Sequence, residues 1–380
     1  MSIQAMTGPS MIYHYPLPIR SKPDSGSQVH IRGMLRGFER IGYKVELVTG
    51  TPGERRKALD RLKREIFEGR VFDLLFSWAP VSPMLMSRKN IKHPFLDFGF
   101  LQWCRRRSIP VGLFYGDVHW RFEHFRQRVP PGRRILMKTL YWYDWWGYLR
   151  WVDHLFLPSL RMRDVLPTSW PSDRVSELHP GCELPAPARS AGGSGPGHLE
   201  LFYVGGIAPP LYDLRPMFNA IRGLDGVFLT VCCREAEWRR FRALYAPIDD
   251  SRVRIVHASG PDLAAYYARA DLYGLFWEPN AYLNVTMPVK VFEALQHGVP
   301  IITAAGTVAA RFVARQDIGW TVANADEFRA LLERLRHQPE LIEQKRRHAQ
   351  TLREDCSWSH RAQQVADTLL GCDRTAFRND

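Results

Sequence analysis

Long hydrophobic runs are missing from this sequence of 380 residues. No apolar stretch reaches about eighteen residues, the length that a transmembrane helix requires. Residues 1–10 form a short polar segment that lacks the basic start and the apolar core of a secretory signal peptide. We therefore expect neither a membrane-spanning helix nor a secretory leader.

Cysteine is scarce as well, and its spacing matches neither a metal site nor a disulfide framework. The six cysteines are Cys104, Cys182, Cys232, Cys233, Cys356 and Cys372. This usage fits a reducing compartment. We expect a cytoplasmic protein, which could also bind peripherally to the cytoplasmic face of a membrane. We expect no bound metal and no organic cofactor.

Acidic residues are outnumbered: 39 Asp and Glu stand against 52 Lys and Arg, a formal net charge of +13. Such a balance implies an acidic partner, either nucleic acid, anionic lipid or a phosphorylated substrate. Charge alone does not choose among the three. The hydrophobic content of 45% is enough for two domains with proper cores.

Buried-strand patterns alternate with helical patterns along most of the chain, which predicts doubly wound parallel sheets. The expected strands are 12–15, 44–49, 72–77, 111–115, 154–158, 175–178, 199–204, 227–231, 253–256, 272–277, 301–303 and 320–322. A helix is expected over about 28–41. Two such halves predict a cleft between facing sheet ends, where ligands bind in this architecture.

Residues 185–198 are dense in Pro, Ala, Gly and Ser and form the expected linker. We therefore expect an N-terminal domain over 1–184 and a C-terminal domain over 199–350. The tail, 339–370, has a helical pattern, and 351–380 is expected to pack back toward the N-terminal domain.

The segment 282–300 is the most informative stretch of the chain. Pro288 suits a helix start and Gly298 a helix end, so Lys290 and Glu293 share one face of the helix near its N-terminus. Free backbone N–H groups and the helix dipole make this a place for phosphate. The structural alternative is a solvated surface ion pair of little consequence.

The pattern Pro288, Lys290, Glu293, Ala294, Gly298 and Pro300 resembles the donor-site motif of GT-B glycosyltransferases. Weaker resemblances follow in the family's order: Gly26-Ser27, residues 179–183, Gly205-Gly206 and Ser357-Trp358. The resemblance implies two Rossmann-like domains and sugar transfer from a nucleotide-diphosphate donor. It also implies that Glu293 binds the donor ribose and that Lys290 lies near the diphosphate.

The chain departs from the family's pattern in two places. Val285 stands where many members have a second glutamate, and residues 207–213 lack the usual Arg…Lys pair. The form Met287-Pro288-Val-Lys290 looks more like the inverting bacterial exopolysaccharide glucuronosyltransferases. Retention or inversion of the anomeric centre therefore stays open, and Arg234 is the expected second cation for the diphosphate.

Inversion needs a general base for the acceptor hydroxyl. Asp117, which follows a buried strand and Gly116, matches the aspartate of the inverting relatives, and His119 is the second candidate. An N-cap is the structural alternative for Asp117, and an ordinary loop histidine is the alternative for His119. The Gly26-Ser27 loop is expected to face the acceptor or a phosphate.

Three further residues are weaker donor-site candidates. His257 can stack under the nucleotide base, while Tyr282 and Met287 can line the donor pocket. Each also fits ordinary packing. Gly205 and Gly206, after the first strand of the C-terminal half, complete the predicted donor site.

Aromatic and basic residues crowd the stretch 133–151. Its aromatic members are Tyr141, Trp142, Tyr143, Trp145, Trp146, Tyr148 and Trp151. The mixture suits an anionic membrane surface. The structural alternative is a domain core rich in aromatic residues, which explains about half of these side chains. The same mixture suits single-stranded nucleic acid, but no RNA-binding signature accompanies the stretch, so the membrane surface is favoured.

The predicted function is therefore metal-independent glycosyl transfer from a nucleotide sugar to a lipid-linked or cell-surface saccharide, with no nucleic-acid partner. A nucleotide-sugar epimerase on the same fold, a non-catalytic sugar-nucleotide sensor and a basic nucleic-acid-binding protein are the alternatives.

Overall fold

The structure is a computed structural model that describes residues 8–20, 26–86, 90–184, 197–248 and 251–371. The chain forms two compact units. Unit 1 comprises Met1–Gly181 and Trp358–Asp380, and unit 2 comprises Cys182–Ser357. The observed division falls a few residues from the predicted boundaries at 184 and 350. It falls there because Cys182 donates to the Cys356 carbonyl (2.8 Å) and bridges Ser357, which ties both ends of unit 2 together.

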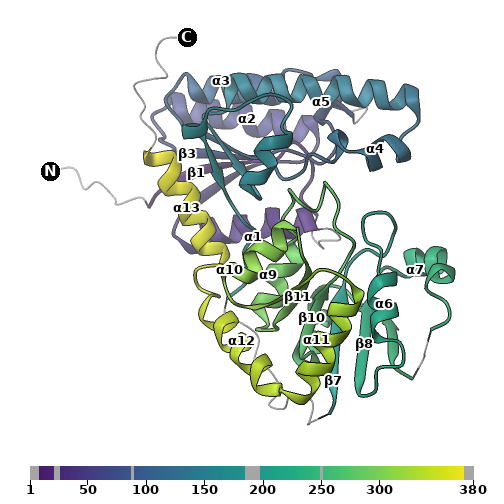
Figure 1. The fold of residues 1–380 in the computed structure, drawn as a ribbon. Coiled ribbons are helices and arrows are strands. Elements are labelled where there is room, and N and C mark those ends of the chain that lie inside the picture. Colours follow the sequence, from purple (N-terminus) through teal and green to yellow (C-terminus); the bar gives the residue numbers. More distant parts are fainter. Residues whose placement is uncertain (1–7, 21–25, 87–89, 185–196, 249–250, 372–380) are drawn as a thin grey trace. The chain divides into compact units, whose positions relative to one another are not determined.

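Unit 1 is built on a parallel sheet that, within its described residues, has six strands in the order β2-β1-β3-β4-β5-β6 (Figure 1). The strands are β1 (Ser10–His14), β2 (Lys44–Val48), β3 (Leu74–Trp78), β4 (Val111–Phe114), β5 (His154–Leu157) and β6 (Val175–Glu177). β3, β4 and β5 are buried at every position. Such continuous apolar strands are typical of parallel sheets covered on both faces.

Helices flank this sheet (Figure 1). They are α1 (Gly26–Arg40), α2 (Pro52–Phe67), α3 (Leu96–Arg105), α4 (Glu123–Arg128), α5 (Pro131–Trp151) and α13 (Trp358–Gly371), with short 3-10 turns η1 (Met84–Met86), η2 (Asn90–Lys92), η3 (His119–Arg121), η4 (Leu160–Val165) and η5 (Ser172–Arg174).

The C-terminal helix α13 packs against α1 inside unit 1. Two glycines of α1 permit the close approach. A Cβ on Gly33 would lie 2.2 Å from the Trp358 ring, and a Cβ on Gly37 would lie 2.3 Å from the Trp358 carbonyl oxygen. The tail predicted as helical over 339–370 is thus two helices, of which α12 (Pro339–Thr351) belongs to unit 2 and α13 to unit 1.

Unit 2 repeats the architecture, with the strand order β12-β11-β10-β7-β8-β9 over its described residues. Its strands are β7 (Leu199–Val204), β8 (Val227–Cys232), β9 (Val253–Val256), β10 (Leu272–Leu275), β11 (Ile301–Ala304) and β12 (Gly319–Val322). Its helices are α6 (Arg215–Ile221), α7 (Glu235–Phe241), α8 (Leu263–Arg269), α9 (Val289–Gln296), α10 (Val308–Arg315), α11 (Ala325–His337) and α12, with the turns η6 (Arg242–Tyr245) and η7 (Gly260–Asp262).

Each of the strands expected from the sequence is present, with ends that differ by at most a few residues. All the strand pairs in both sheets are parallel over the described residues. The predicted doubly wound α/β class is confirmed.

Candidate functional site

The strand order of unit 2 reverses direction beside β7. From β7 the chain winds outward through β8 and β9, and then returns to the other side of β7 with β10. In such sheets, the two strands beside the reversal send their following loops to opposite faces of the sheet. A crevice for ligands is left between these loops, at the carboxyl ends of the strands. α9 follows β10 at this place, so its N-terminus belongs to the edge where ligands bind.

The N-terminus of α9 carries no side-chain cap. The helix was expected to start at Pro288, but Pro288 is the N-cap residue, one position before the first helical residue Val289, and offers no side-chain hydrogen bond. The first N–H groups of a helix have no carbonyl partner within the helix. They are suited to an anion, as the helix dipole also is. Gly298, with a φ of 64°, ends the helix as predicted.

Lys290 and Glu293 form an ion pair on α9. The Lys290 Nζ lies 2.5 Å from the Glu293 Oε2, and the two side chains are 27% and 19% exposed. The Tyr267 hydroxyl donates to the same carboxylate oxygen over 3.3 Å. The pair is therefore half-buried, and Lys290 keeps further N–H donors for a ligand because an ammonium has three.

The Lys290 ammonium lies within electrostatic reach of the carboxyl end of β8. Burial raises the pKa of the Cys232 thiol there, and the charge of Lys290 opposes that rise. The predicted cation and the strand end next to β7 are thus neighbours. The alternative of a fully solvated surface pair does not describe this arrangement.

The predicted Gly205 and Gly206 form the turn after β7. Tyr203 donates its hydroxyl to the Gly206 carbonyl, and Tyr245 donates to the Ile207 carbonyl over 2.5 Å. A Cβ on Gly206 would lie 2.9 Å from the Tyr212 ring. Two tyrosines therefore fix the backbone of this turn, and a side chain at position 206 would disturb it.

Arg234 and His257 follow the next two strand ends. The Arg234 side chain is 72% exposed, and its Nη1 lies 3.9 Å from the Glu237 Oε2. His257 is exposed and donates from Nδ1 to the Cys233 carbonyl over 2.8 Å. Both residues lie at the sheet edge that also carries Lys290. Tyr282 is half-buried, whereas Met287 is 6% exposed and belongs to the core of unit 2, the packing role considered for it above.

In unit 1, Asp117 and His119 follow the carboxyl end of β4. The Asp117 Oδ1 accepts the His119 N–H over 2.8 Å, but the N-cap residue of η3 is Val118, so Asp117 is not the N-cap that the structural alternative supposed. Its Oδ2 lies 3.4 Å from the His119 Nδ1. Both side chains are 20% exposed, so the contact with the His119 N–H does not fully bury the carboxylate, and the two candidate bases lie side by side.

The His119 ring lies between Tyr141 and Asp117. Tyr141 of α5 gives its hydroxyl proton to the Val81 carbonyl over 2.8 Å and presents its oxygen to the His119 Nε2 at 3.2 Å. On the other side of the ring, the Nδ1 lies 3.4 Å from the Asp117 Oδ2 without a hydrogen bond in the described residues. Tyr141 thus positions the imidazole beside the Asp117 carboxylate, and Asp117 stays the first candidate for a base with His119 as the second.

Gly26 and Ser27 form the first turn of α1. Gly26 is exposed and Ser27 half-buried. The residues just before them, 21–25, lie outside the described residues. The predicted acceptor or phosphate loop therefore stays a prediction.

Comparison with known proteins adds two findings. Residues 215–367 match the family model described as glycosyl transferase-like, a range that includes Arg234, His257, Lys290 and Glu293. No curated protein sequence matches the chain significantly.

Solved structures match nearly the whole chain. Sucrose-phosphate synthase from Thermosynechococcus elongatus has 14% sequence identity and a TM-score of 0.63, with 94% of this chain and 98% of that chain covered. HepE from Anabaena, in complex with UDP and glucose, has 12% identity and a TM-score of 0.62, with 96% and 100% covered. WaaG, a glycosyltransferase of lipopolysaccharide biosynthesis, has 15% identity and a TM-score of 0.59, with 95% and 100% covered.

The chain has the GT-B fold. The structural similarity shows this fold, and the family match shows a likeness to glycosyl transferases over residues 215–367.

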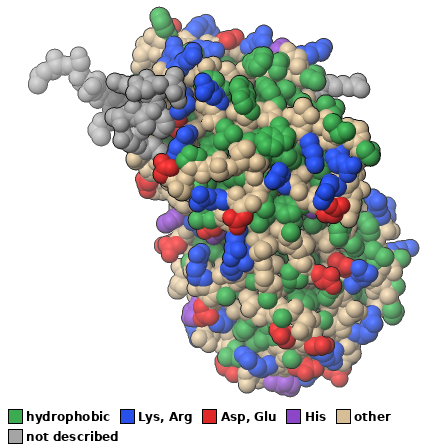
Figure 2. Space-filling model, turned by 45° about the horizontal axis from the view of Figure 1, so that its top comes forward, with side chains coloured by type: hydrophobic (Ala, Val, Ile, Leu, Met, Phe, Trp, Pro, Cys, Tyr) green, Lys and Arg blue, Asp and Glu red, His purple; other side chains and the backbone are tan. Residues whose placement is uncertain are grey.

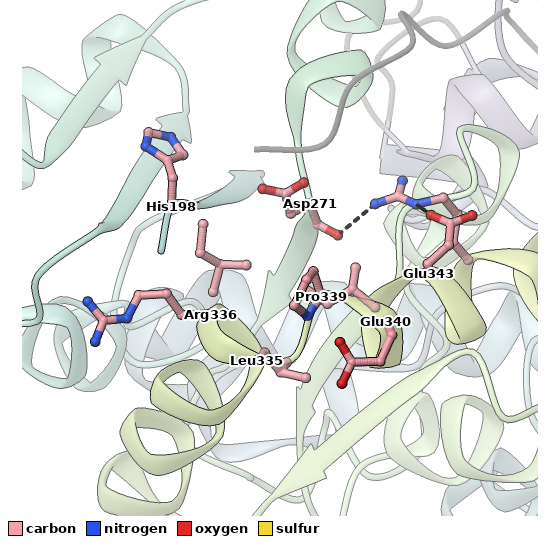
Figure 3. A pocket seen from close by; sticks show the side chains of 10 residues that line it. His198, Asp271, Leu335, Arg336, Pro339, Glu340 and Glu343 are labelled. Carbon is pink, nitrogen blue, oxygen red and sulfur yellow. Dashed lines mark hydrogen bonds and ion pairs between the residues drawn. The ribbon is translucent and has the colours of Figure 1, made fainter. Parts of the chain in front are cut away.

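Figure 3 shows a cavity of about 270 Å³ in unit 2. It is lined by His198 and Asp271, which precede β7 and β10, and by Arg336 and Glu340. The cavity therefore lies at the amino ends of the strands, opposite the edge that carries Lys290. None of the predicted donor residues lines it.

Sequence reasoning missed Glu237. Its Oε1 accepts the Ile207 N–H over 3.3 Å, and its Oε2 is buried with no hydrogen bond within the described residues. Arg234 is the cation beside it. The spacing of three between Arg234 and Glu237 across the start of α7 was the available signal, but it resembles many surface pairs.

A buried polar cluster at the reversal of the unit 1 sheet was also missed. His14, at the end of β1, contacts the Ser77 hydroxyl (2.8 Å) and the Asp97 carboxylate (3.0 Å). Arg55 donates twice to Asp97, over 2.8 and 2.9 Å. Burial alone would raise the pKa of Asp97, but the partners His14 and Arg55 outweigh it and lower that pKa. The members are too far apart in sequence for a local pattern to show them.

The part of the chain that the structure describes contains no helix with the length and hydropathy to span a bilayer. Nor does it bring together three or more His, Cys, Asp or Glu side chains in a metal-binding arrangement.

Proposed function

We propose that unit 2 binds the nucleotide-diphosphate part of a sugar donor at the N-terminus of α9. The observation that carries this proposal is the half-buried pair of Lys290 and Glu293 at the carboxyl ends of the strands beside the sheet reversal. Lys290 and the free N–H groups meet the diphosphate, and Glu293 accepts hydrogen bonds from the ribose hydroxyls.

The solved structures of similar fold support this choice of donor. HepE has been solved with UDP, with UDP-glucose, and with UDP and glucose. As the bond between the anomeric carbon and the donor phosphate breaks, negative charge grows on the phosphate oxygen that leaves the sugar. A cation and a helix N-terminus that are fixed in advance stabilise that charge. In our proposal this stabilisation replaces a bound metal ion.

Unit 1 supplies the group that activates the acceptor. In an inverting transfer, the acceptor oxygen bonds to the anomeric carbon while the bond from that carbon to the diphosphate oxygen breaks. The proton of the acceptor hydroxyl passes to the Asp117 carboxylate, and the electron pair leaves with the nucleotide diphosphate. The His119 backbone N–H donates to the Asp117 Oδ1 over 2.8 Å and so helps to hold the carboxylate in place.

The acceptor that we infer is a saccharide carried on a lipid or at the cell surface, in polysaccharide or glycolipid biosynthesis. The net charge of +13 and the basic and aromatic stretch 133–151 support an acidic, membrane-bound partner. The site of transfer then lies at a membrane surface, in a protein of the cytoplasm.

Product formation tests the proposal. Purified protein is incubated with a panel of nucleotide sugars, with and without lipid-linked saccharides, and the released nucleotide diphosphate is measured. We expect release that depends on both substrates and continues in the presence of a chelator. Conversion of the sugar nucleotide without any acceptor would instead identify an epimerase, and binding of the donor without turnover would identify a sensor. Retention of oligonucleotides with a steep salt dependence, and no response to nucleotide sugars, would identify a nucleic-acid-binding protein.

A further inference from the structure

Helix α5 of unit 1 has two different faces. Its inner face, formed by Met137, Tyr141, Asp144, Trp145 and Tyr148, is buried. Its outer face carries five large apolar side chains, which are Ile135, Leu136, Trp142, Trp146 and Leu149, with exposed fractions of 69%, 51%, 44%, 55% and 36%. The structure thus assigns about half of the aromatic residues of this stretch to the core, and leaves two tryptophans outside it.

One continuous stripe, which we call the α5 stripe, is formed by Ile135, Trp142, Trp146 and Leu149. Ile135, Trp142, Trp146 and Leu149 follow spacings of seven, four and three residues along the helix. Residues with these spacings lie one above another on one side of a helix. Phe95, 68% exposed, extends the apolar surface, because the adjacent Pro94 accepts a hydrogen bond from Tyr143 of α5.

The charge around the α5 stripe is mainly positive. From residue 119 to residue 151 the sequence has seven Lys and Arg but only Glu123 and Asp144 as acids, and Asp144 is 4% exposed. Arg133, Arg126 and Arg150 are exposed on the same segment. Figure 2, in which the top of Figure 1 comes forward, shows hydrophobic side chains among Lys and Arg on the face that carries α3 and α5.

We propose that the α5 stripe docks on an anionic lipid bilayer. Tryptophan and aliphatic side chains enter the boundary between headgroups and acyl chains, and the arginines around them meet anionic headgroups. A second copy of this chain fits less well, since a self-complementary interface would set these cations against each other. Nucleic acid fits less well too, because aliphatic side chains, and not cations, occupy the centre of the surface.

The α5 stripe lies directly behind the candidate base of unit 1. Tyr141, which faces inward next to Trp142, holds His119, and its ring stacks on Trp120 with centroids 4.9 Å apart. The Trp142 ring also contacts Trp120, at 6.4 Å. Docking through the α5 stripe therefore places the Asp117 loop close to the lipid surface, where the sugar of a lipid-linked acceptor lies. This last step depends on the proposed function, but the docking does not.

Vesicle binding tests the proposal with the full chain. Sedimentation is measured with vesicles of phosphatidylcholine alone and of phosphatidylcholine mixed with phosphatidylglycerol, at low and high salt. We expect binding that requires the anionic lipid and weakens with salt. Trp142 and Trp146 should also shift their fluorescence to the blue as they leave water.

Paired variants assign the surface. Trp142→Ser with Trp146→Ser, and separately Arg133→Glu with Lys138→Glu, should each lower partitioning about tenfold or more. Leu244→Ser is the matched control, because Leu244 is 45% exposed but belongs to unit 2 and not to the α5 stripe. Thermal melts check that each variant folds, which we expect because the changed side chains are largely exposed.

Three results would overturn the proposal. One is equal binding of the variants and the parent protein to anionic vesicles, and another is no vesicle binding by the parent protein. The third is a dimer in light scattering that the Trp142 and Trp146 changes abolish, which would assign the α5 stripe to a second copy. Nucleotide binding at Lys290 is independent of each of these results, so failure here and failure of the proposed function are distinguishable.

Discussion

The two candidate sites of this protein both follow the carboxyl ends of parallel strands, but they are built differently. In unit 2, Lys290 and Glu293 belong to one short helix and pair with each other. In unit 1, Asp117 and His119 lie in a loop and a 3-10 turn, and Tyr141 of the distant helix α5 holds His119. One site is local in sequence and the other is assembled from separate elements.

This difference assigns different tasks to the two sites. A cation at a helix N-terminus binds charge whatever happens at the other unit, so changes in unit 2 should alter donor binding. A carboxylate held by neighbours beside a strand end is suited to proton transfer, so changes in unit 1 should alter turnover. The predictions below test this division from the largest expected effect to the smallest.

Asp117→Asn should lower kcat by about 10²–10⁴, because an amide cannot accept the acceptor proton. Its Oδ1 can still take the His119 N–H, so the loop should keep its shape. Steady-state kinetics give kcat, and calorimetry should show an unchanged Kd for the donor. Glu123→Gln, an exposed acid on the nearby helix α4, is the control. Normal turnover in the Asp117 variant would remove Asp117 as the base.

Asp144→Asn should change the pH dependence of stability. Burial raises the pKa of Asp144 from 3.8 to about 8, even though the Met84 N–H opposes the rise. The folded state therefore holds a proton that the unfolded chain releases. Stability that is present below about pH 4 is lost as the pH rises toward 8, at up to about 1.4 kcal/mol per pH unit.

The amide cannot ionise, so the Asp144→Asn variant should lose this part of the slope and should be more stable than the parent protein at pH 8. Thermal melts between pH 5 and 9 measure the difference between the two proteins. Parallel curves for both would show that Asp144 ionises in the folded state as easily as in the unfolded state.

Glu293→Gln should reduce the preference for ribose over deoxyribose by about tenfold, because a charged acceptor makes stronger hydrogen bonds to hydroxyls than a neutral one. The measurement compares the Kd of a nucleotide diphosphate with the Kd of its 2′-deoxy form. The change at Lys290, which loses its ion-pair partner, affects both ligands and cancels in this ratio. An unchanged ratio would place the ribose elsewhere.

Arg234→Ala should weaken binding of the diphosphate only a few-fold, since the side chain is exposed and its charge is screened. Glu237→Gln should give a smaller loss in the same direction if the Glu237 charge orients Arg234. Arg239→Ala is the matched control, because Arg239 pairs with Glu235 on the same helix. An equal loss for Arg239→Ala would mean that only the net charge matters.

Much of the fold could be predicted from the sequence, because continuous apolar strands and glycine helix ends are local signals. α9 and its end at Gly298 were predicted on those grounds, and the structure confirms them. The cluster of His14, Arg55 and Asp97 could not be predicted, since its members come from three separate elements.

The two faces of α5 could be predicted only in part. The sequence indicates an aromatic helix, but tertiary packing decides that Trp145 is buried while Trp146 is exposed. The same holds for Glu237, whose buried oxygen depends on the turn after β7. Burial of a single side chain is a property of the folded environment, and a short sequence pattern does not contain it.

The central claim is that the start of α9 binds the diphosphate of the donor. Calorimetry tests it most directly, with UDP, GDP, ADP, CDP and dTDP, each next to its own nucleoside, on the parent protein and on Lys290→Ala. We predict that the parent protein binds one diphosphate far more tightly than its nucleoside. The variant should lose about 10- to 100-fold of that advantage, with nucleoside binding unchanged. An advantage that survives intact in Lys290→Ala would contradict the account.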